Sequence, residues 1–142
     1  MKKAMFIGAI GCGKTTLIQR LNDNAIHYDK TQTIEYYDNI IDTPGEYVEH
    51  RYMYSNLMTT AMGAEVIVLM QSATDSRVIL PTGFSTMFSC DTIGIVTKTD
   101  LATQADIDTV SARLKDAGAK PIFAVSAVDD INIDQISDYL EI

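Results

Sequence analysis

The sequence predicts an α/β fold with a five-stranded, mainly parallel sheet and helices on its flanks. Short apolar segments alternate with stretches of helical periodicity, the pattern of a parallel sheet with right-handed crossovers. The later segments are nearly continuous in valine, isoleucine and phenylalanine, as expected of strands buried on both faces. The expected strands are Ala4 to Ile7, Tyr36 to Ile41, Val66 to Met70, Thr92 to Thr97 and Pro121 to Val125.

Helix signals fill the intervals between these segments. Thr103 and Asp106 have the spacing of a capping box, and Gly118 stands where the helix that they open should end. A further helix is expected over about residues 48–62, and a last one where apolar residues recur at helical spacing over residues 133–140. Ligands of such a sheet bind at the carboxyl ends of its strands, so we expect the functional residues there.

The composition favours one compact domain over residues 1–142. A hydrophobic fraction of 46% is enough for a core without disulfides, and Cys12 and Cys90 are expected to be free thiols. The apolar runs are far shorter than the roughly 20 residues of a membrane span, and no signal sequence precedes the first strand, so we expect a cytoplasmic protein. The formal net charge is -8 and Lys2-Lys3 is the only basic cluster, which argues against a nucleic-acid partner.

The first expected strand runs into a glycine-rich loop, residues 8–15, that fits G-x-x-x-x-G-K-[ST]. A plausible helix follows, and this strand–loop–helix context favours a phosphate-binding loop over a chance glycine-rich turn. Glycines let successive backbone N–H groups point at phosphate oxygens, Lys14 should reach the β- and γ-phosphates, and the Thr15 hydroxyl should bind Mg²⁺. The expected phosphate-binding residues are Gly8, Gly11, Cys12, Gly13, Lys14, Thr15 and Thr16.

A second motif, Asp42-Thr43-Pro44-Gly45, follows the next expected strand. Asp42 is suited to hold Mg²⁺ through water, and the N–H of Gly45 can approach a γ-phosphate because no side chain obstructs it. Taken alone, D-x-x-G is often only a turn. The polar stretch upstream offers Thr31 or Thr33 as a further Mg²⁺ ligand, and spacing does not choose between them.

The last two expected strands end in Thr97-Lys98-x-Asp100 and Ser126-Ala127. With these segments the chain resembles the small GTPases of the Ras-like, translation-factor-related class, whose motifs occur in the same order. The resemblance implies that Asp100 accepts hydrogen bonds from the guanine edge, that the Lys98 stem packs on the purine, and that Ser126 and Ala127 complete the base pocket. Thr97 replaces the usual asparagine and lacks one of its hydrogen-bonding groups. Taken alone, Asp100 also fits a helix N-cap or turn, and Ser126 a solvated loop hydroxyl.

A narrower resemblance is to the EutP/PduV family, encoded with ethanolamine- and propanediol-utilisation bacterial microcompartments. It is carried by residues 30–32, 35–37, 41–47, 71–75 and 94–100. It implies Thr31 as the switch threonine, Mg²⁺ with GTP or GDP (alternatively ATP) as ligands, and a location in the cytoplasm or at microcompartments. Shell or cargo proteins would then bind through the switch region. Family members have been implicated in microcompartment positioning and in acetate kinase activity with ATP.

Three features depart from a typical Ras-like switch. Only about ten residues separate Thr31 from Asp42, so the antiparallel strand usual at this sheet edge is expected to be missing. Glu46 replaces a water-orienting glutamine and would be repelled by a γ-phosphate unless protonated or turned away, so its role stays open. Ile10 occupies a position where a branched side chain should obstruct an arginine finger. Lys14 and Glu46 are the candidate catalytic residues.

These observations predict a Mg²⁺-dependent GTP-binding protein that hydrolyses GTP slowly and interacts with its partner through the switch. The rival is a kinase that transfers the γ-phosphoryl group of ATP to a carboxylate such as acetate. Arg51 and Arg77 are isolated in the sequence and supply no arginine-rich acceptor site. A scaffold that binds nucleotide without turnover is a third alternative, because of Glu46.

Overall fold

The structure is a computed structural model that describes residues 2–21, 35–37 and 40–140, and of residues 35–37 the backbone alone. The polar stretch with Thr31 and Thr33 lies outside the described residues. Within the described part of the chain, no helix is long and apolar enough to cross a membrane.

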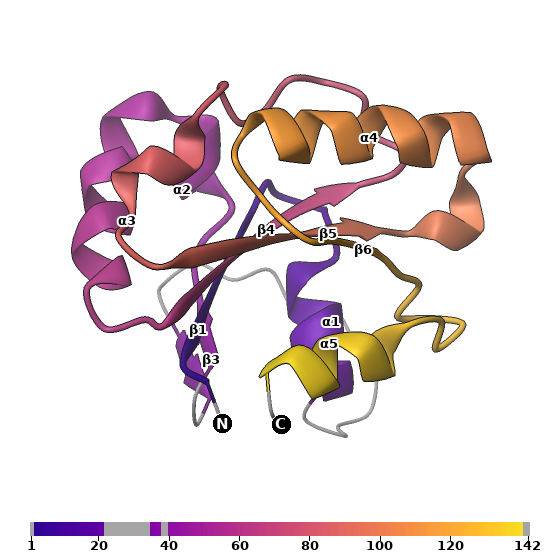
Figure 1. Ribbon diagram of the computed structural model, residues 1–142, viewed down its shortest axis with the longest axis horizontal. Helices are drawn as coiled ribbons and strands as arrows, with labels where there is room; N and C mark the ends of the chain where they lie inside the picture. Colours follow the sequence, from indigo (N-terminus) through magenta and orange to yellow (C-terminus); the bar gives the residue numbers. More distant parts are fainter. Residues whose placement is uncertain (1, 22–34, 38–39, 141–142) are drawn as a thin grey trace.

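One six-stranded sheet runs through the molecule, in the order β2-β3-β1-β4-β5-β6 (Figure 1). Five of its strands are parallel, as the sequence predicts, and β2 is antiparallel to β3. The strands are β1 (Ala4–Gly8), β2 (Glu35–Tyr37), β3 (Ile40–Asp42), β4 (Val66–Ser72), β5 (Asp91–Thr97) and β6 (Ile122–Ala124).

The antiparallel edge strand corrects the prediction that this strand would be missing. β2 pairs with β3 in the register Glu35↔Asp42 and Tyr37↔Ile40, so the single strand expected over 36–41 is two strands. The spacing argument assumed strands of ordinary length. Each strand here has three residues and spans only about 10 Å at 3.3 Å per residue, so the pair fits between Thr31 and Asp42.

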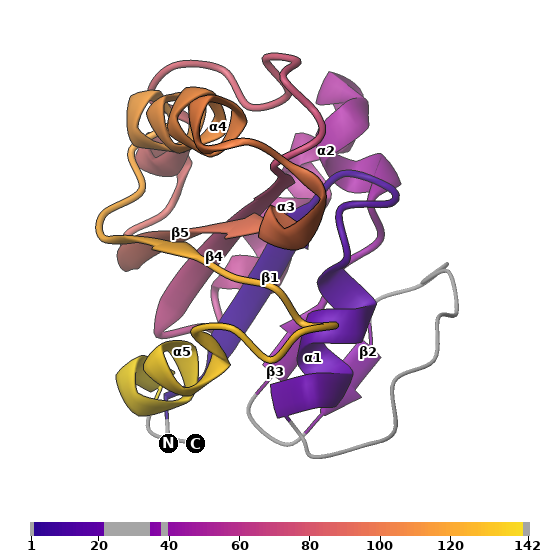
Figure 2. The same ribbon diagram turned by 90° about the vertical axis from the view of Figure 1, so that its right-hand side faces the viewer.

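Helices cover both faces of the sheet (Figure 2). One face carries α1 (Lys14–Leu21) and α5 (Ile133–Leu140), and the other carries the remaining helices. The remaining helices are α2 (Glu46–Glu49), α3 (Tyr54–Ala61), α4 (Gln104–Asp116) and three short 3-10 segments, η1 (Arg51–Met53), η2 (Phe84–Met87) and η3 (Thr99–Leu101).

Alternate residues of β1 enter opposite layers of the core. Ala4 and Phe6 pack with buried residues of α1 and α5, whereas Met5 and Ile7 pack with those of α2, α3 and α4. All four side chains are fully buried. This alternation is the two-residue period of a strand covered on both faces, and it fixes the strand that leads into the phosphate loop.

Two helix predictions have different outcomes. The capping box is confirmed, because the Asp106 N–H donates to Thr103 Oγ1 over 3.2 Å and the Thr103 N–H donates to Asp106 Oδ2 over 3.1 Å.

The prediction of a continuous helix over residues 48–62 is wrong. His50 is extended, with φ -126° and ψ 110°, and divides the segment into α2, η1 and α3. Val48 of α2 and Leu57 of α3 are both buried in the same layer of the core, so the two short helices pack there separately on either side of the break.

Candidate nucleotide site

The phosphate loop connects β1 directly to α1 at the carboxyl edge of the sheet. Gly11 and Gly13 have φ values of 81° and 91°, in the left-handed region that favours glycine. At Gly8 the constraint is space, because a Cβ there would lie 2.5 Å from the sulfur of Cys12 and 3.1 Å from the carbonyl oxygen of Met70. The loop is therefore the strand–loop–helix unit that the sequence predicts.

Lys14 and Asp42 form a buried ion pair behind this loop. Lys14 Nζ lies 2.7 Å from Asp42 Oδ1, with side-chain exposures of 6% and 0%. The Thr15 hydroxyl donates to Asp42 Oδ2 over 3.3 Å. The register Phe6↔Asp42 between β1 and β3 places the carboxylate there. Two residues of the phosphate loop thus contact the acidic residue of the second motif.

Thr15 and Asp42 are also suited to hold Mg²⁺. Mg²⁺ prefers oxygen ligands in an octahedron and usually keeps several waters among them. The Thr15 hydroxyl lies 3.3 Å from Asp42 Oδ2 and both residues are buried, so Asp42 would be within reach of a water ligand of an ion that Thr15 binds. No group of three or more His, Cys, Asp or Glu side chains that could hold a metal occurs among residues 2–21, 35–37 and 40–140. A bound ion would need ligands besides Thr15 and Asp42 to complete its octahedral shell.

The turn of the second motif packs on the phosphate loop. A Cβ added to Gly45 would lie 2.5 Å from the backbone nitrogen of Ile10 and 2.8 Å from its Cα. Gly45 is buried, whereas Ile10 is 39% exposed. Glu46 follows Gly45 as the first residue of α2 and is partly buried. The two motifs that the sequence assigns to the γ-phosphate are thus in contact.

The end of β5 is hydrogen-bonded to the same loop. The Thr97 hydroxyl donates to the carbonyl of Cys12, and Lys98 Nζ donates to the carbonyl of Gly11 over 2.7 Å. Lys98 turns the chain there with a left-handed backbone, φ 57° and ψ 37°. These contacts join two segments that lie far apart in the sequence, and they place the expected base-reading residues beside the phosphate loop.

Asp100 and Ser126 form a second contact at this edge. Ser126 Oγ donates to Asp100 Oδ1 over 2.9 Å and accepts from the Asp129 N–H over 3.1 Å. Ser126 is fully buried, so it is not a solvated loop hydroxyl. Asp100 is not a helix N-cap either, because it lies in η3 and Thr103 caps α4.

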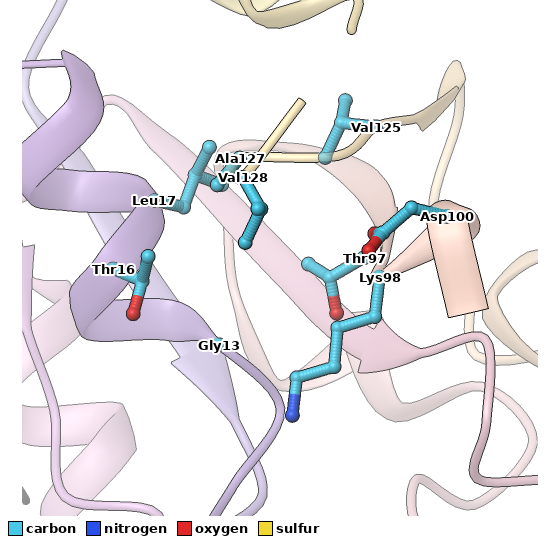
Figure 3. A pocket seen from close by; sticks show the side chains of 9 residues that line it. All are labelled: Gly13, Thr16, Leu17, Thr97, Lys98, Asp100, Val125, Ala127 and Val128. Atoms are coloured by element: carbon cyan, nitrogen blue, oxygen red, sulfur yellow. The ribbon is translucent and has the colours of Figure 1, made fainter. Parts of the chain in front are cut away.

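A cleft of about 90 Å³ that opens to solvent lies between these segments (Figure 3). Figure 3 shows Thr16 and Leu17 of α1 on one side, and Lys98 and Asp100 on the other. The cleft is lined by Gly13, Thr16, Leu17, Thr97, Lys98, Asp100, Val125, Ala127 and Val128.

Three residues of this lining are absent from the sequence-based set: Leu17, Val125 and Val128. Val128 is 67% exposed, and its position directly after Ser126-Ala127 is the signal that could have identified it. Leu17 lies one turn into α1, where its spacing marks it only as a core residue. An apolar lining with one carboxylate at its edge suits a flat heterocycle that presents N–H donors.

The Cys12 thiol of the phosphate loop is buried. Burial raises the pKa of Cys12, and the nearby charge of Lys14 only partly opposes this effect. Burial likewise raises the pKa of Cys90. Both cysteines are free thiols, as the sequence predicts.

Solved structures with the same fold include several GTP-binding proteins. A probable GTP-binding protein, EngB, matches 95% of this chain and 94% of its own with a TM-score of 0.65 and 19% identity. Era, solved with MgGDPNP and a segment of 16S ribosomal RNA, has a TM-score of 0.64 and 20% identity over 97% of this chain and 55% of its own. Translation elongation factor SelB from Methanococcus maripaludis, solved with a GTP analogue, has a TM-score of 0.66 and 18% identity over 99% of this chain and 33% of its own.

Sequence relatives give the narrower assignment. The propanediol utilization protein PduV of Citrobacter freundii is 40% identical over 140 residues, which are 99% of this chain and 93% of the relative. A relative from Escherichia coli K12 that is named a probable acetate kinase, EutP, is 35% identical over 99% of this chain and 89% of its own. The family model described as ethanolamine utilisation - propanediol utilisation matches residues 1–142. The chain belongs to this family, PduV-EutP, and has the fold of the P-loop GTPases.

Proposed function

We propose that this protein binds a guanine nucleotide with Mg²⁺ in the cleft between the phosphate loop and the end of β5, and that it hydrolyses GTP slowly. One observation carries the proposal. Thr97 and Lys98 donate hydrogen bonds to two consecutive carbonyls of the phosphate loop, those of Cys12 and Gly11. Gly13 of the phosphate loop and Asp100, the proposed base-reading residue, line the same cleft, which supports the proposal.

The phosphates belong at the loop of residues 8–15. Its glycines allow the backbone N–H groups to point inward, and the N-terminus of α1 adds the positive end of its dipole. Lys14 would neutralise the β- and γ-phosphates, and the N–H of Gly45 would approach the γ-phosphate. Mg²⁺, held by Thr15, by Asp42 through water and by the proposed switch residue Thr31, neutralises the terminal phosphates when bound.

The base belongs against Asp100. Guanine presents two adjacent N–H donors, and a carboxylate accepts both as a bidentate pair. Ser126 Oγ donates to Asp100 Oδ1, and this contact orients the carboxylate without using all of its acceptor capacity. The Lys98 stem and the apolar side chain of Val128 line the same cleft and would contact the faces of the purine. Adenine offers no such donor pair and would leave Asp100 desolvated and unpaired.

Slow hydrolysis follows from two residues near the γ-phosphate position. Glu46 cannot orient an attacking water as a glutamine amide does, and its negative charge is repelled by the phosphate. Ile10 is 39% exposed on the phosphate loop and obstructs the approach of a partner's arginine. Because hydrolysis is slow, GTP would stay bound for a long time. A long-lived GTP-bound state suits a switch that recruits a partner.

Membership of the family described as ethanolamine utilisation - propanediol utilisation supports a role for the proposed switch in one of these two pathways. The partner that we propose is a shell or cargo protein of a microcompartment. It would bind the switch region of this protein in the cytoplasm. Such a partner would recognise the switch region, of which α2 is the described part, because α2 begins directly after Gly45, whose N–H is proposed to approach the γ-phosphate.

An acetate kinase is the rival activity, and relatives from Escherichia coli and Salmonella bear that name. An acceptor carboxylate requires a cation beside the γ-phosphate. Three of the four arginines contact other groups, and the fourth is exposed: Arg20 lies 3.6 Å from Asp130, Arg77 is paired with Asp75, Arg113 donates to the Ser76 carbonyl and Arg51 is exposed on η1. This distribution favours the GTPase proposal.

One competition experiment separates the two activities. The purified protein is titrated with GTP and ATP in the presence of Mg²⁺, and acetyl phosphate is assayed after incubation with ATP and acetate. We expect GTP to bind at least about a hundredfold more tightly, a difference on the order of 3 kcal/mol. Tighter binding of ATP, together with formation of acetyl phosphate, would reject the GTPase in favour of the kinase.

A further inference from the structure

We propose that Asp42 masks Lys14 until Mg²⁺ arrives, so that the metal controls phosphate affinity by releasing this lysine. Asp42 is then a positioning residue for Lys14 as well as a candidate metal ligand. The inference rests on the proposed nucleotide site. It starts from the ion pair between Lys14 Nζ and Asp42 Oδ1, at 2.7 Å and with side-chain exposures of 6% and 0%.

The ion pair with Asp42 already neutralises the positive charge of Lys14 that would otherwise bind the phosphates. Lys14 is the first residue of α1, and its ammonium points back to the carboxylate on β3. A buried ammonium held by a carboxylate at hydrogen-bond distance is already compensated. A triphosphate that approaches without metal must draw Lys14 away from Asp42, and this separation leaves the carboxylate buried beside further negative charge. Two effects therefore oppose the binding of a metal-free triphosphate: the loss of the Lys14–Asp42 ion pair, and the repulsion between Asp42 and the phosphates.

Mg²⁺ reverses this balance. The divalent ion placed by the Thr15 hydroxyl and Asp42 compensates the carboxylate, so Lys14 can turn to the phosphates at little electrostatic cost. If Asp42 serves only as a metal ligand, replacing it changes the affinity for GTP only when Mg²⁺ is present. If it also masks Lys14, replacing it must strengthen binding in the absence of metal. The two roles therefore differ in a measurement without Mg²⁺: the first predicts no change in affinity and the second predicts a gain.

The first experiment measures GTP affinity by calorimetry, with Mg²⁺ and with EDTA, for the wild type and for Asp42→Asn. We expect the variant to bind metal-free GTP about tenfold more tightly than the wild type, and GTP with Mg²⁺ more weakly. Asp138→Asn is the matched control. Asp138 is exposed on α5, and the control removes the same charge without touching the site. Metal-free affinity of Asp42→Asn equal to or below that of the wild type would overturn the inference.

Replacing Asp42 in a Lys14→Met variant distinguishes two effects: the release of Lys14 from its ion pair, and the loss of repulsion between Asp42 and the phosphates. The metal-free gain from Asp42→Asn should vanish in this background, because no lysine remains to be released. A gain that persists without Lys14 would show that Asp42 only repels the phosphates, and the masking role would be wrong. Failure of the wild type to bind GTP even with Mg²⁺ would overturn the proposed function and this inference together.

A third measurement does not involve nucleotide. Thermal unfolding of the wild type, both single variants and the double variant, all without nucleotide and metal, reports whether the pair exists in the resting protein. Removing one partner leaves the other buried and uncompensated, so the double variant should be less destabilised than the sum of the single variants. Strictly additive effects would overturn the inference even if GTP binds as proposed.

Discussion

Gly45 lies against the backbone of Ile10, so that the turn of the second motif is seated on the phosphate loop. A Cβ at position 45 would come within 2.5 Å of the Ile10 nitrogen and 2.8 Å of its Cα. Such distances require a shift of backbone, because neither atom is the end of a flexible side chain. This contact couples the start of α2 to the loop that precedes α1.

We therefore expect Gly45→Ala to lower the free energy of unfolding by about 1–3 kcal/mol, the range for inserting a carbon into a packed site. Denaturant unfolding measures the effect. Gly63→Ala is the control, because a Cβ there would meet only the Thr60 carbonyl at 3.9 Å. Ile10→Gly should rescue Gly45→Ala only in part, since two of the three closest atoms, the nitrogen and the Cα, belong to the Ile10 backbone and the third is its Cγ1. Equal stability of Gly45→Ala and Gly63→Ala would contradict the packing argument.

Lys14→Ala should weaken GTP binding in the presence of Mg²⁺ by about 2–5 kcal/mol, the cost of truncating one partner of a buried charge pair. Calorimetry of wild type and variant gives this value. Lys115→Ala, on the exposed surface of α4, is a suitable control because it removes the same charge away from the cleft. An unchanged affinity in Lys14→Ala would remove Lys14 from the phosphate site.

Asp100→Asn should turn the base preference from GTP towards XTP. The 2-oxo group of xanthine needs a donor where guanine needs an acceptor, and an asparagine amide supplies one. The measurement is a titration of wild type and variant with GTP, XTP and ATP, with Asp138→Asn as a control of equal charge. A variant that keeps its preference for GTP would show that Asp100 does not read the base.

Glu46→Gln should raise the rate of GTP hydrolysis if the carboxylate is obstructive. The wild type is expected to turn over no faster than the 10⁻⁴ s⁻¹ scale, on the order of unassisted hydrolysis by Ras-like proteins. Single-turnover phosphate release measures both rates. Glu49→Gln is the matched control, because it lies on the same helix and removes the same charge. A marked loss of activity in Glu46→Gln alone would instead identify Glu46 as a catalytic base.

Cys12 should be alkylated by iodoacetamide much more slowly in the native protein than in urea. Burial raises its pKa, so at any pH below that value the thiolate fraction is smaller than for an ordinary cysteine, and its side chain is also covered. Mass spectrometry of a Cys90→Ser variant, labelled at two pH values, follows Cys12 alone. Equal rates in the native and the unfolded protein would mean that the loop around Cys12 is open.

Much of the fold and site could be predicted from the sequence because the signals are local. The phosphate loop needs glycine at two positions of positive φ, and α4 needs a capping box at Thr103 and Asp106, so a short stretch of chain specifies each one. The alternation of apolar strands with helices predicts five parallel strands for the same reason. The separation of Thr31 from Asp42, by contrast, gave the wrong answer, because it does not report how short β2 and β3 are.

The sequence by itself determined the parallel sheet, the phosphate loop and the types of residue at each strand end. Only the tertiary structure decided which of these residues touch. The β1–β3 register brings Asp42 to Lys14, the end of β5 reaches the carbonyls of Gly11 and Cys12, and Val128 lines the cleft. These contacts join segments separated by many residues, and their geometry depends on how strands pair and layers pack. No local propensity encodes that pairing, because its free energy arises from surfaces that meet only in the folded chain.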